Sequence, residues 1–384
     1  MRELVNARMD NLVRTHIRVL GCRQPAFRTC GGIGLVLAIA LSLGLAWARG
    51  LEMGVVFGLA LMCCVSFLAL VMARKIVSGG ERLVYYHHEI AALLAAVAFL
   101  LISRRSVLPY LDVTILGVGV FLACGRIGCL LVGCCHGRPA LWGPRYRSEH
   151  VAVGFESCLG GVRLFPVAAL EALCVLMIVT VGLVFVAEDR PPGDSLAWYT
   201  VAYAVARFGF EYLRGDAGRS YWKGSSEAQW TSLGLASLAV LAELAGRLPF
   251  RPWHLLCPAF LLALTMLNAS FGTAPRQLVH PKHIREIAEA ISHLGKRSTD
   301  CAGILVQVTS LGLRISLGIV SAEQDQIEHY SFSRQAPGLS GSEAQAVAAL
   351  LLRLRPGAAS GTIVRGHEGV FHLIIGRDQC LGSA

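Results

Sequence analysis

Long blocks of apolar residues, separated by short polar segments, dominate the first two thirds of this 384-residue chain. Each block approaches the ~20 residues that an α-helix needs to cross a bilayer. The third block is short, and we expect its helix to begin earlier, near residue 84. The fold class predicted is an all-α polytopic membrane protein with seven or eight transmembrane helices. The predicted spans are 31–48, 51–72, 90–103, 113–133, 165–187, 196–213, 229–246 and 253–272.

The hydrophobic pattern changes near Thr273, after which amphipathic and alternating segments replace the apolar blocks. Isoleucines at helical spacing predict a helix over 281–296, and a cap at Ser340 or Ser342 predicts another that ends near residue 355. We expect residues 275–384 to form a small C-terminal α+β soluble domain, and it carries no catalytic motif that we recognise. Its predicted strands are 303–309, 311–320, 361–365 and 369–375.

The first 29 residues are too long and too charged for the start of a cleavable signal peptide, and the apolar block that follows has no small-residue cleavage site. We predict instead an amphipathic helix over 4–19 that lies at the membrane surface, with Arg8, Arg14 and Arg18 facing water. The predicted organisation is an N-terminal amphipathic segment over 1–29, a transmembrane domain over 30–272, and the C-terminal domain.

Composition supports a membrane protein and indicates the charge of its partners. Apolar residues make up 54% of the chain and charged residues only 16%, whereas soluble proteins carry about a quarter. The net charge is +10 and nearly all basic residues are arginine, whose planar fork suits bidentate phosphate binding. We therefore expect anionic membrane lipid as a partner. Nucleic acid is not expected, because no basic module interleaved with aromatic residues is visible.

Two arginines lie where membrane helices should approach water. Arg126 belongs to a stretch, 125–139, that also carries three cysteines and a histidine. Arg207, Glu211 and Arg214 follow at helical spacing, which predicts one charged helix face. Such a face either anchors the helix at the interface or lines a cavity for an anionic ligand. Arg207 lies about two turns inside its predicted helix, which favours the cavity.

Several short motifs, with the intervals between them, resemble the prolipoprotein diacylglyceryl transferase family over roughly residues 27–246. Members of that family are multi-pass enzymes of the bacterial inner membrane that act in lipoprotein biosynthesis. They transfer the diacylglyceryl group of phosphatidylglycerol to the thiol of a lipobox cysteine in a preprotein, and they release glycerol phosphate. The motifs are Tyr86-His87, Arg104-Arg105, Gly125-Arg126-Ile127-Gly128, Gly133, Gly137-Arg138-Pro139, Pro166 with Glu171, Arg207-Phe208-x-x-Glu211-x-x-Arg214-x-Asp216, and Gln229-Trp230-x-Ser232.

The resemblance implies roles for residues of this chain. Arg126 and Arg207 would stabilise the charge of the departing phosphate, with Glu211 orienting one of them. Arg138 and Arg214 would join them in binding phosphatidylglycerol. His87 stands at the position of the family's histidine and would act as the base that activates the thiol. No metal or organic cofactor is implied.

Departures from the family pattern gather near these residues. His88-Glu89 stands where the family has two glycines, and Cys129 and Cys134 stand where it has Asn and Glu. Cys30, His136, Phe165 and Ala228 are further substitutions. Two other functions therefore stay open: a lipid-modifying enzyme with another acceptor, and a non-enzymatic protein that binds anionic lipid.

The thirteen cysteines of the chain have no regular spacing that would suggest a disulfide framework. Several cysteines lie inside apolar blocks, where they pack as small hydrophobes: Cys63, Cys64, Cys124, Cys174 and Cys257. Cys129, Cys134, Cys135 and His136 admit three interpretations: small residues that pack a turn, reactive or redox-active thiols, and a metal site. We favour the first, because the spacing C-x4-C-C-H would make adjacent residues ligands of one ion, which is not a usual structural-zinc pattern. We interpret His280, His283 and His293 as surface histidines, because their spacings do not converge on one ion.

The membrane orientation is open. The resemblance implies that the N-terminus and the loops 134–164 and 214–228 lie outside, and an eighth span would place the C-terminal domain outside as well. The positive-inside rule agrees for Arg104-Arg105 and for the loop 247–251, and it disagrees for residues 1–29 and 134–164.

Overall fold

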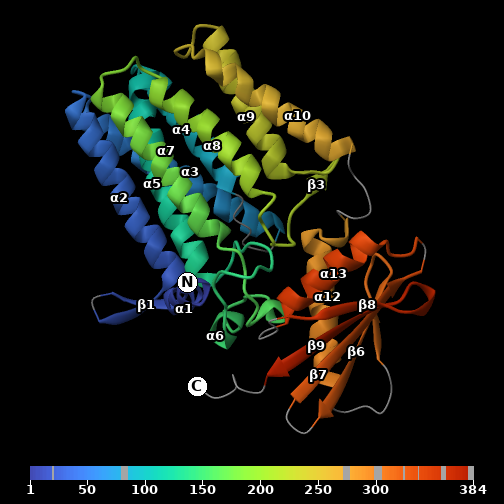
Figure 1. Cartoon of the computed structure of the whole chain (residues 1–384). Coiled ribbons are helices and arrows are strands. Elements are labelled where there is room, and N and C mark those ends of the chain that lie inside the picture. Colours follow the sequence, from blue (N-terminus) through green and yellow to red (C-terminus); the bar gives the residue numbers. More distant parts are fainter. Residues whose placement is uncertain are drawn as a thin grey trace.

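The computed structural model consists of a helical bundle and a C-terminal α+β domain (Figure 1). The predicted boundary near Thr273 lies outside the described residues. The structure describes residues 1–19, 21–78, 85–270, 277–297, 305–322, 325–335, 337–355 and 360–378.

Each of the eight predicted apolar blocks forms a helix of the bundle. Among the described residues, five helices are long and apolar enough to cross a membrane (α2, α3, α5, α7, and α10 with the short helix before it), and α4 is a shorter apolar helix. The early start predicted for the third block is confirmed, because α4 begins at Tyr85. The bundle helices are α2 Ala26–Ala48, α3 Met53–Ser78, α4 Tyr85–Ile102, α5 Val107–Val132, α7 Val167–Ala187, α8 Asp194–Phe210, α9 Glu227–Leu244, the 3-10 helix η2 Pro252–Leu255 and α10 Leu256–Ser270.

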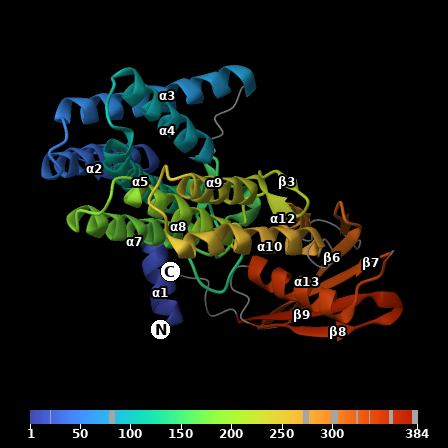
Figure 2. The same cartoon turned by 90° about the horizontal axis from the view of Figure 1, so that it is seen from above.

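Helix α5 is the central element of the bundle (Figure 2). In its most apolar stretch 61% of the residues are buried, against 11% in α3, which presents most of its surface outward. Gly117 lets α2 approach α5 closely, since a Cβ at this position would lie 2.9 Å from the carbonyl oxygen of Ala38. Small residues at such contacts are typical of packed membrane helices.

The predicted N-terminal helix over 4–19 is too long. Helix α1 (Arg2–Leu12) ends at Leu12. A β-hairpin formed by β1 (His16–Val19) and β2 (Cys22–Pro25) follows after a short connection. The backbone N–H of Arg14 donates to the carbonyl oxygen of Leu131, which ties this segment to the end of α5 and competes with continued helix. Arg8, Arg14 and Arg18 are exposed, as predicted.

Loop segments at the end of the bundle that carries the N-terminal hairpin pack against the C-terminal domain (Figure 1). The loop between α5 and α7 contains α6 (Ser148–Val151) and the 3-10 helix η1 (Ser157–Leu159). Its buried residues form one hydrophobic core with the C-terminal domain, and Arg285 Nη1 lies 3.5 Å from Glu156 Oε1. The two parts of the chain are therefore packed together.

The C-terminal domain has a five-stranded antiparallel sheet in the order β5-β6-β7-β9-β8 and two helices that share its core. The two predicted helices and four predicted strands are present, although residues 303 and 304 of the first strand lie outside the described residues. The sequence analysis missed β7. The elements are α12 Pro281–Arg297, β5 Val306–Val308, β6 Leu313–Ala322, β7 Asp325–Arg334, α13 Gly341–Leu354, β8 Thr362–Arg365, the 3-10 helix η3 His367–Gly369 and β9 Phe371–Asp378.

The prediction of three surface histidines is wrong for His283. Its side chain is buried, with Nδ1 2.7 Å from the carbonyl oxygen of Leu278 and Nε2 2.8 Å from Thr309 Oγ1. These contacts fasten the start of α12 to the loop before β6. His280 is partly exposed and His293 is exposed, as predicted.

Candidate anion-binding site

Glu171 is the centre of a buried cluster of arginines at one end of the bundle. This is the end that carries α6 and the C-terminal domain, and we call it the loop-bearing end (Figure 1). It is the one charged residue of α7, and its side chain is fully buried. Arg126 Nε lies 3.0 Å from Glu171 Oε2, and Arg207 Nε lies 3.7 Å from Oε1. Arg214 Nη1 lies 3.7 Å from Oε2, and the Tyr203 hydroxyl donates a 3.0 Å hydrogen bond to Oε1. We call Arg126, Arg207, Arg214 and Glu171 the arginine cluster.

Two further carboxylates hold the outer side of the arginine cluster. Glu211 forms ion pairs with Arg207 and with Arg219, whose Nη1 lies 2.6 Å from Oε1. Asp216 accepts from Arg214 Nε and from Arg219 Nε, each at 2.9 Å. Buried charges are costly unless they are paired, so these contacts fix the positions of the guanidinium groups.

The predicted single helix face is only partly correct. Helix α8 ends at Phe210, and Glu211 is its C-cap. The chain then turns, and Arg214 forms an isolated β-bridge with Gly137. The three charges still meet, because this bridge returns Arg214 toward Glu171.

Arg138 lies beside the arginine cluster, because its side-chain Nε donates to the backbone carbonyl oxygen of Arg214 at 3.3 Å. The structure therefore brings together four of the predicted site arginines and Glu211. His87 lies elsewhere, at the start of α4. Its Nε2 is 2.8 Å from Glu227 Oε1, and its Nδ1 contacts Arg74. The proposed role of His87 as a base stays a prediction.

Electrostatics at the outer side of the cluster favour the charged forms of both carboxylates. Burial alone would raise the pKa of Glu211, but Arg207, Arg219 and Arg214 outweigh it and lower that pKa below its usual value. The pKa of Asp216 is also lowered, because Arg214 and Arg219 together exceed the effect of its burial. Both groups thus remain anionic partners of the arginines.

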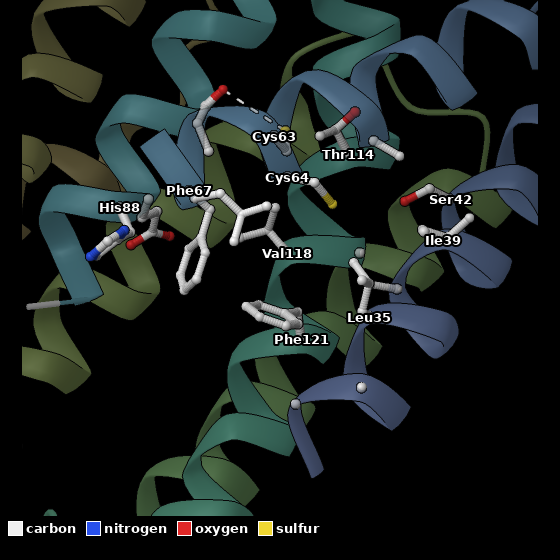
Figure 3. Close-up of a pocket in the computed structure, with 18 of the residues that line it drawn as sticks. Leu35, Ile39, Ser42, Cys63, Cys64, Phe67, His88, Thr114, Val118 and Phe121 are labelled. Carbon is white, nitrogen blue, oxygen red and sulfur yellow. Dashed lines mark hydrogen bonds between the residues drawn. The ribbon is translucent and has the colours of Figure 1, made fainter. Parts of the chain in front are cut away.

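An apolar cavity of about 420 Å³ lies between α2, α3, α4 and α5 (Figure 3). Leu35 and Ile39 of α2 face Val118 and Phe121 of α5 across it. At one end His88 packs its ring against Phe67, with 4.6 Å between ring centroids. The neighbouring buried residue Glu89 also lines the cavity, and the ring centroid of Tyr86, on the same face of α4, lies 6.0 Å from Arg207 Cζ. The cavity therefore approaches the arginine cluster.

A family model described as prolipoprotein diacylglyceryl transferase matches residues 47–244, which is slightly more than half of the chain. The chain belongs to this family. The matched residues contain all four members of the arginine cluster.

Similar relatives are named phosphatidylglycerol–prolipoprotein diacylglyceryl transferase. One from Dehalococcoides mccartyi is 31% identical over 132 residues, which cover 34% of this chain and 48% of the relative. One from Clostridium perfringens is 26% identical over 117 residues, 30% of this chain and 43% of the relative. One from Clostridium tetani is 27% identical over 114 residues, 29% of this chain and 43% of the relative. The chain thus aligns with slightly less than half the length of these relatives.

The sequence analysis gave no role to Glu171, Tyr203, Asp216 or Arg219. A signal existed for Glu171, because a lone carboxylate within an apolar helix marks a functional position by default. No comparable signal existed for Arg219, which lies in a polar loop.

Proposed function

We propose that this chain is a membrane transferase that moves the diacylglyceryl group of phosphatidylglycerol to the thiol of a lipobox cysteine in a preprotein. The observation that carries this proposal is the arginine cluster beside an apolar cavity. The cluster suits an anionic phosphate headgroup, and the cavity suits acyl chains. Family membership and the names of the relatives support the same reaction.

The phosphate would bind where guanidinium groups are held rigidly by buried carboxylates. Arg214 Nη1 is too far from Glu171 Oε2 for a hydrogen bond and has no other hydrogen-bond partner among the described residues, so it can donate to a ligand. Arg138, at the outer side of the cluster, would contact the same headgroup. Preorganised donors in a site with little water stabilise the charge that builds on the leaving phosphate.

The reaction itself requires a thiolate and a leaving group. The acceptor sulfur attacks the glyceryl carbon, the bond between that carbon and the phosphate oxygen breaks, and glycerol phosphate departs with the electron pair. His87 is proposed as the base that takes the thiol proton. Its described contacts are with Glu227 and Arg74, so this role rests on the family resemblance.

We further propose eight transmembrane helices in the bacterial inner membrane. If α2, α3, α4, α5, α7, α8, α9 and α10 cross in turn, both ends of the membrane domain lie on one side. The N-terminal hairpin, the loop before α7, the loop between α8 and α9 and the C-terminal domain all gather there (Figure 1). The opposite end carries Arg104, Arg105 and the 247–251 loop, as the positive-inside rule expects on the cytoplasmic side.

The direct test uses purified full-length protein, phosphatidylglycerol labelled in its acyl chains, and a peptide with a lipobox cysteine. We expect label on the peptide, and none when the peptide cysteine is replaced by serine. Label that stays on lipid while the folded protein still binds phosphatidylglycerol vesicles would contradict the transferase and favour a lipid-binding protein. Label on a different acceptor in native membranes would favour another lipid-modifying enzyme.

A further inference from the structure

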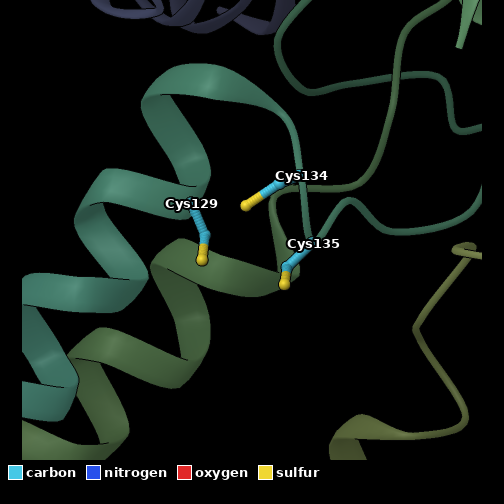
Figure 4. Close-up of side chains that lie close together, drawn as sticks. All are labelled: Cys129, Cys134 and Cys135. Carbon is cyan, nitrogen blue, oxygen red and sulfur yellow. The ribbon is translucent and has the colours of Figure 1, made fainter. Parts of the chain in front are cut away.

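Three cysteine sulfurs meet beside the arginine cluster (Figure 4). The Sγ atoms of Cys129, Cys134 and Cys135 all lie within 4.8 Å of one another, and none of these residues forms a disulfide. Three sulfurs bound to one zinc ion at 2.3 Å lie about 3.8 Å apart in tetrahedral geometry. Small side-chain rotations would close that difference. We call these three residues the cysteine cluster.

The fold brings the cysteine cluster together at the end of α5. Cys129 lies on the last turn of that helix, and Gly133 at its C-cap has φ of 83°. This left-handed residue reverses the chain, so that Cys134 and Cys135 return toward Cys129. A Cβ at Gly133 would lie 2.9–3.0 Å from the rings of Phe155 and Tyr146, which leaves glycine as the residue that suits this turn.

Along the sequence Cys134 and Cys135 are adjacent, which is an unusual arrangement for two ligands of one ion. In the structure the Cys134 side chain nevertheless points toward Cys129 (Figure 4), and the three sulfurs lie within 4.8 Å of one another. His136 is not part of this group of converging side chains, and its Nδ1 lies 2.9 Å from the carbonyl oxygen of Gly137. The group therefore has three ligands, which is the number that catalytic zinc sites provide.

The surroundings suit a metal bound by thiolates. Arg126 Nη1 donates to Cys135 Sγ at 3.6 Å, so the cysteine cluster is in direct contact with the arginine cluster. A nearby guanidinium offsets the negative charge of three thiolates around a divalent ion. Cys134 is exposed, which gives the ion a path from solvent.

We propose that Cys129, Cys134 and Cys135 bind one zinc ion whose fourth position receives the acceptor thiol. The second part of this proposal rests on the proposed transferase function. Coordination would make the acceptor thiol more acidic, so that its proton passes to His87, the base proposed above, and its sulfur would be held as a thiolate. That sulfur then attacks the glyceryl carbon as the phosphate leaves, and the product is a neutral thioether that the metal holds weakly. Metal coordination activates nucleophiles in this way.

Metal content tests the site independently of activity. Full-length protein purified in detergent with a reductant is expected to retain one zinc ion per chain. Cobalt substitution should give thiolate-to-cobalt charge-transfer absorption, which grows on addition of a lipobox peptide but not of its Cys→Ser form. Cys129→Ser and Cys135→Ser should lose the zinc. Cys22→Ser is the matched control, because Cys22 is exposed and lies in the N-terminal hairpin.

The possible outcomes separate the zinc site from the transferase. Wild-type protein that holds no zinc and gives no cobalt band overturns the proposal, as does a disulfide between two of the three cysteines in membranes treated with a thiol-blocking reagent. Full lipid transfer after removal of zinc by a chelator overturns the role of the metal and leaves the transferase intact. Bound zinc with a spectral response to peptide, but without lipid transfer, supports the site and counts against the transferase alone.

Discussion

The two ends of the helical bundle both carry buried charges, but they use them differently. At the loop-bearing end, carboxylates hold arginines beside an apolar cavity. At the opposite end, Asp112 accepts the backbone N–H groups of Gly193 and Leu196 at 2.6 and 2.8 Å. Asp194 pairs there with Arg251, and Glu243 pairs with His254. We call Asp112, Asp194, Glu243 and Arg251 the distal cluster.

The difference between the clusters separates function from architecture. The Asp112 carboxylate satisfies the N–H groups at the start of α8, which a helix must satisfy in any case. The arginine cluster is instead built from ion pairs between side chains, and among the described residues Arg214 Nη1 retains a donor for a ligand. The presence of a buried charge in a membrane helix therefore does not by itself indicate a binding site. The better indication is a hydrogen-bond donor or acceptor that its partners leave available to a ligand.

The largest effect is expected for Glu171→Gln. Removing this charge leaves Arg126, Arg207 and Arg214 facing one another without their shared carboxylate. Breaking a buried ion pair costs about 3–5 kcal/mol, so the free energy of unfolding in detergent should fall by that amount and transfer should cease. Glu188→Gln, at an exposed helix end, is the control. Unchanged stability would show that the arginine cluster is not held by Glu171.

Arg207→Lys keeps the charge but removes the planar fork. Loss of one well-placed donor to the leaving phosphate lowers the rate by roughly 10²–10³-fold. The measurement is the initial rate of label transfer to the lipobox peptide, with Arg190→Lys as a control at the other end of the bundle. A rate within a few-fold of the wild type would remove Arg207 from the site.

Asp112→Asn tests the architectural role of the distal cluster. The amide accepts fewer charge-assisted hydrogen bonds from the start of α8, and we expect the free energy of unfolding to fall by about 1–2 kcal/mol. The transfer rate per folded molecule should not change. A loss of rate without a loss of stability would mean that the two clusters are coupled.

Asp216 predicts a dependence of stability on pH. Its pKa is lower in the folded protein than the usual value because of Arg214 and Arg219. Its stabilising contribution is therefore present above the unfolded pKa of about 3.9 and is lost as the pH falls through the lower folded value. Unfolding measured against pH should show this loss in the wild type, and Asp216→Asn should flatten it. Parallel curves for the two proteins would contradict the assignment.

Arg251→Ala should have the smallest effect. Its side chain is partly exposed, and Arg190 Nη1, 3.9 Å from the same Asp194 carboxylate, remains to compensate that buried charge, so we expect a loss of about 1 kcal/mol. We expect the transfer rate to remain unchanged and the thermal midpoint to shift slightly. A strong loss of transfer would overturn the distinction between the two ends.

The sequence predicted the helices well because each apolar block has the length and composition of a span. It failed at β7, where Glu328 lies in a core-facing position between residues that otherwise alternate. Its charge is compensated by Arg355, which lies 27 residues further along the chain. It also failed at His283, whose partner Thr309 lies 26 residues further along the chain. In both cases the compensating residue belongs to another element.

For the site, the sequence by itself determined which arginines stand near the ends of apolar helices, since a charge at such a depth is conspicuous in any apolar pattern. Only the tertiary structure decided that Glu171 joins them, because α5, α7 and α8 must pack before their side chains meet. The same holds for the three cysteines. Their spacing along the chain argued against one ion, whereas the turn at Gly133 places their sulfurs together. Spacing along a chain constrains neighbours within one element, and packing decides the rest.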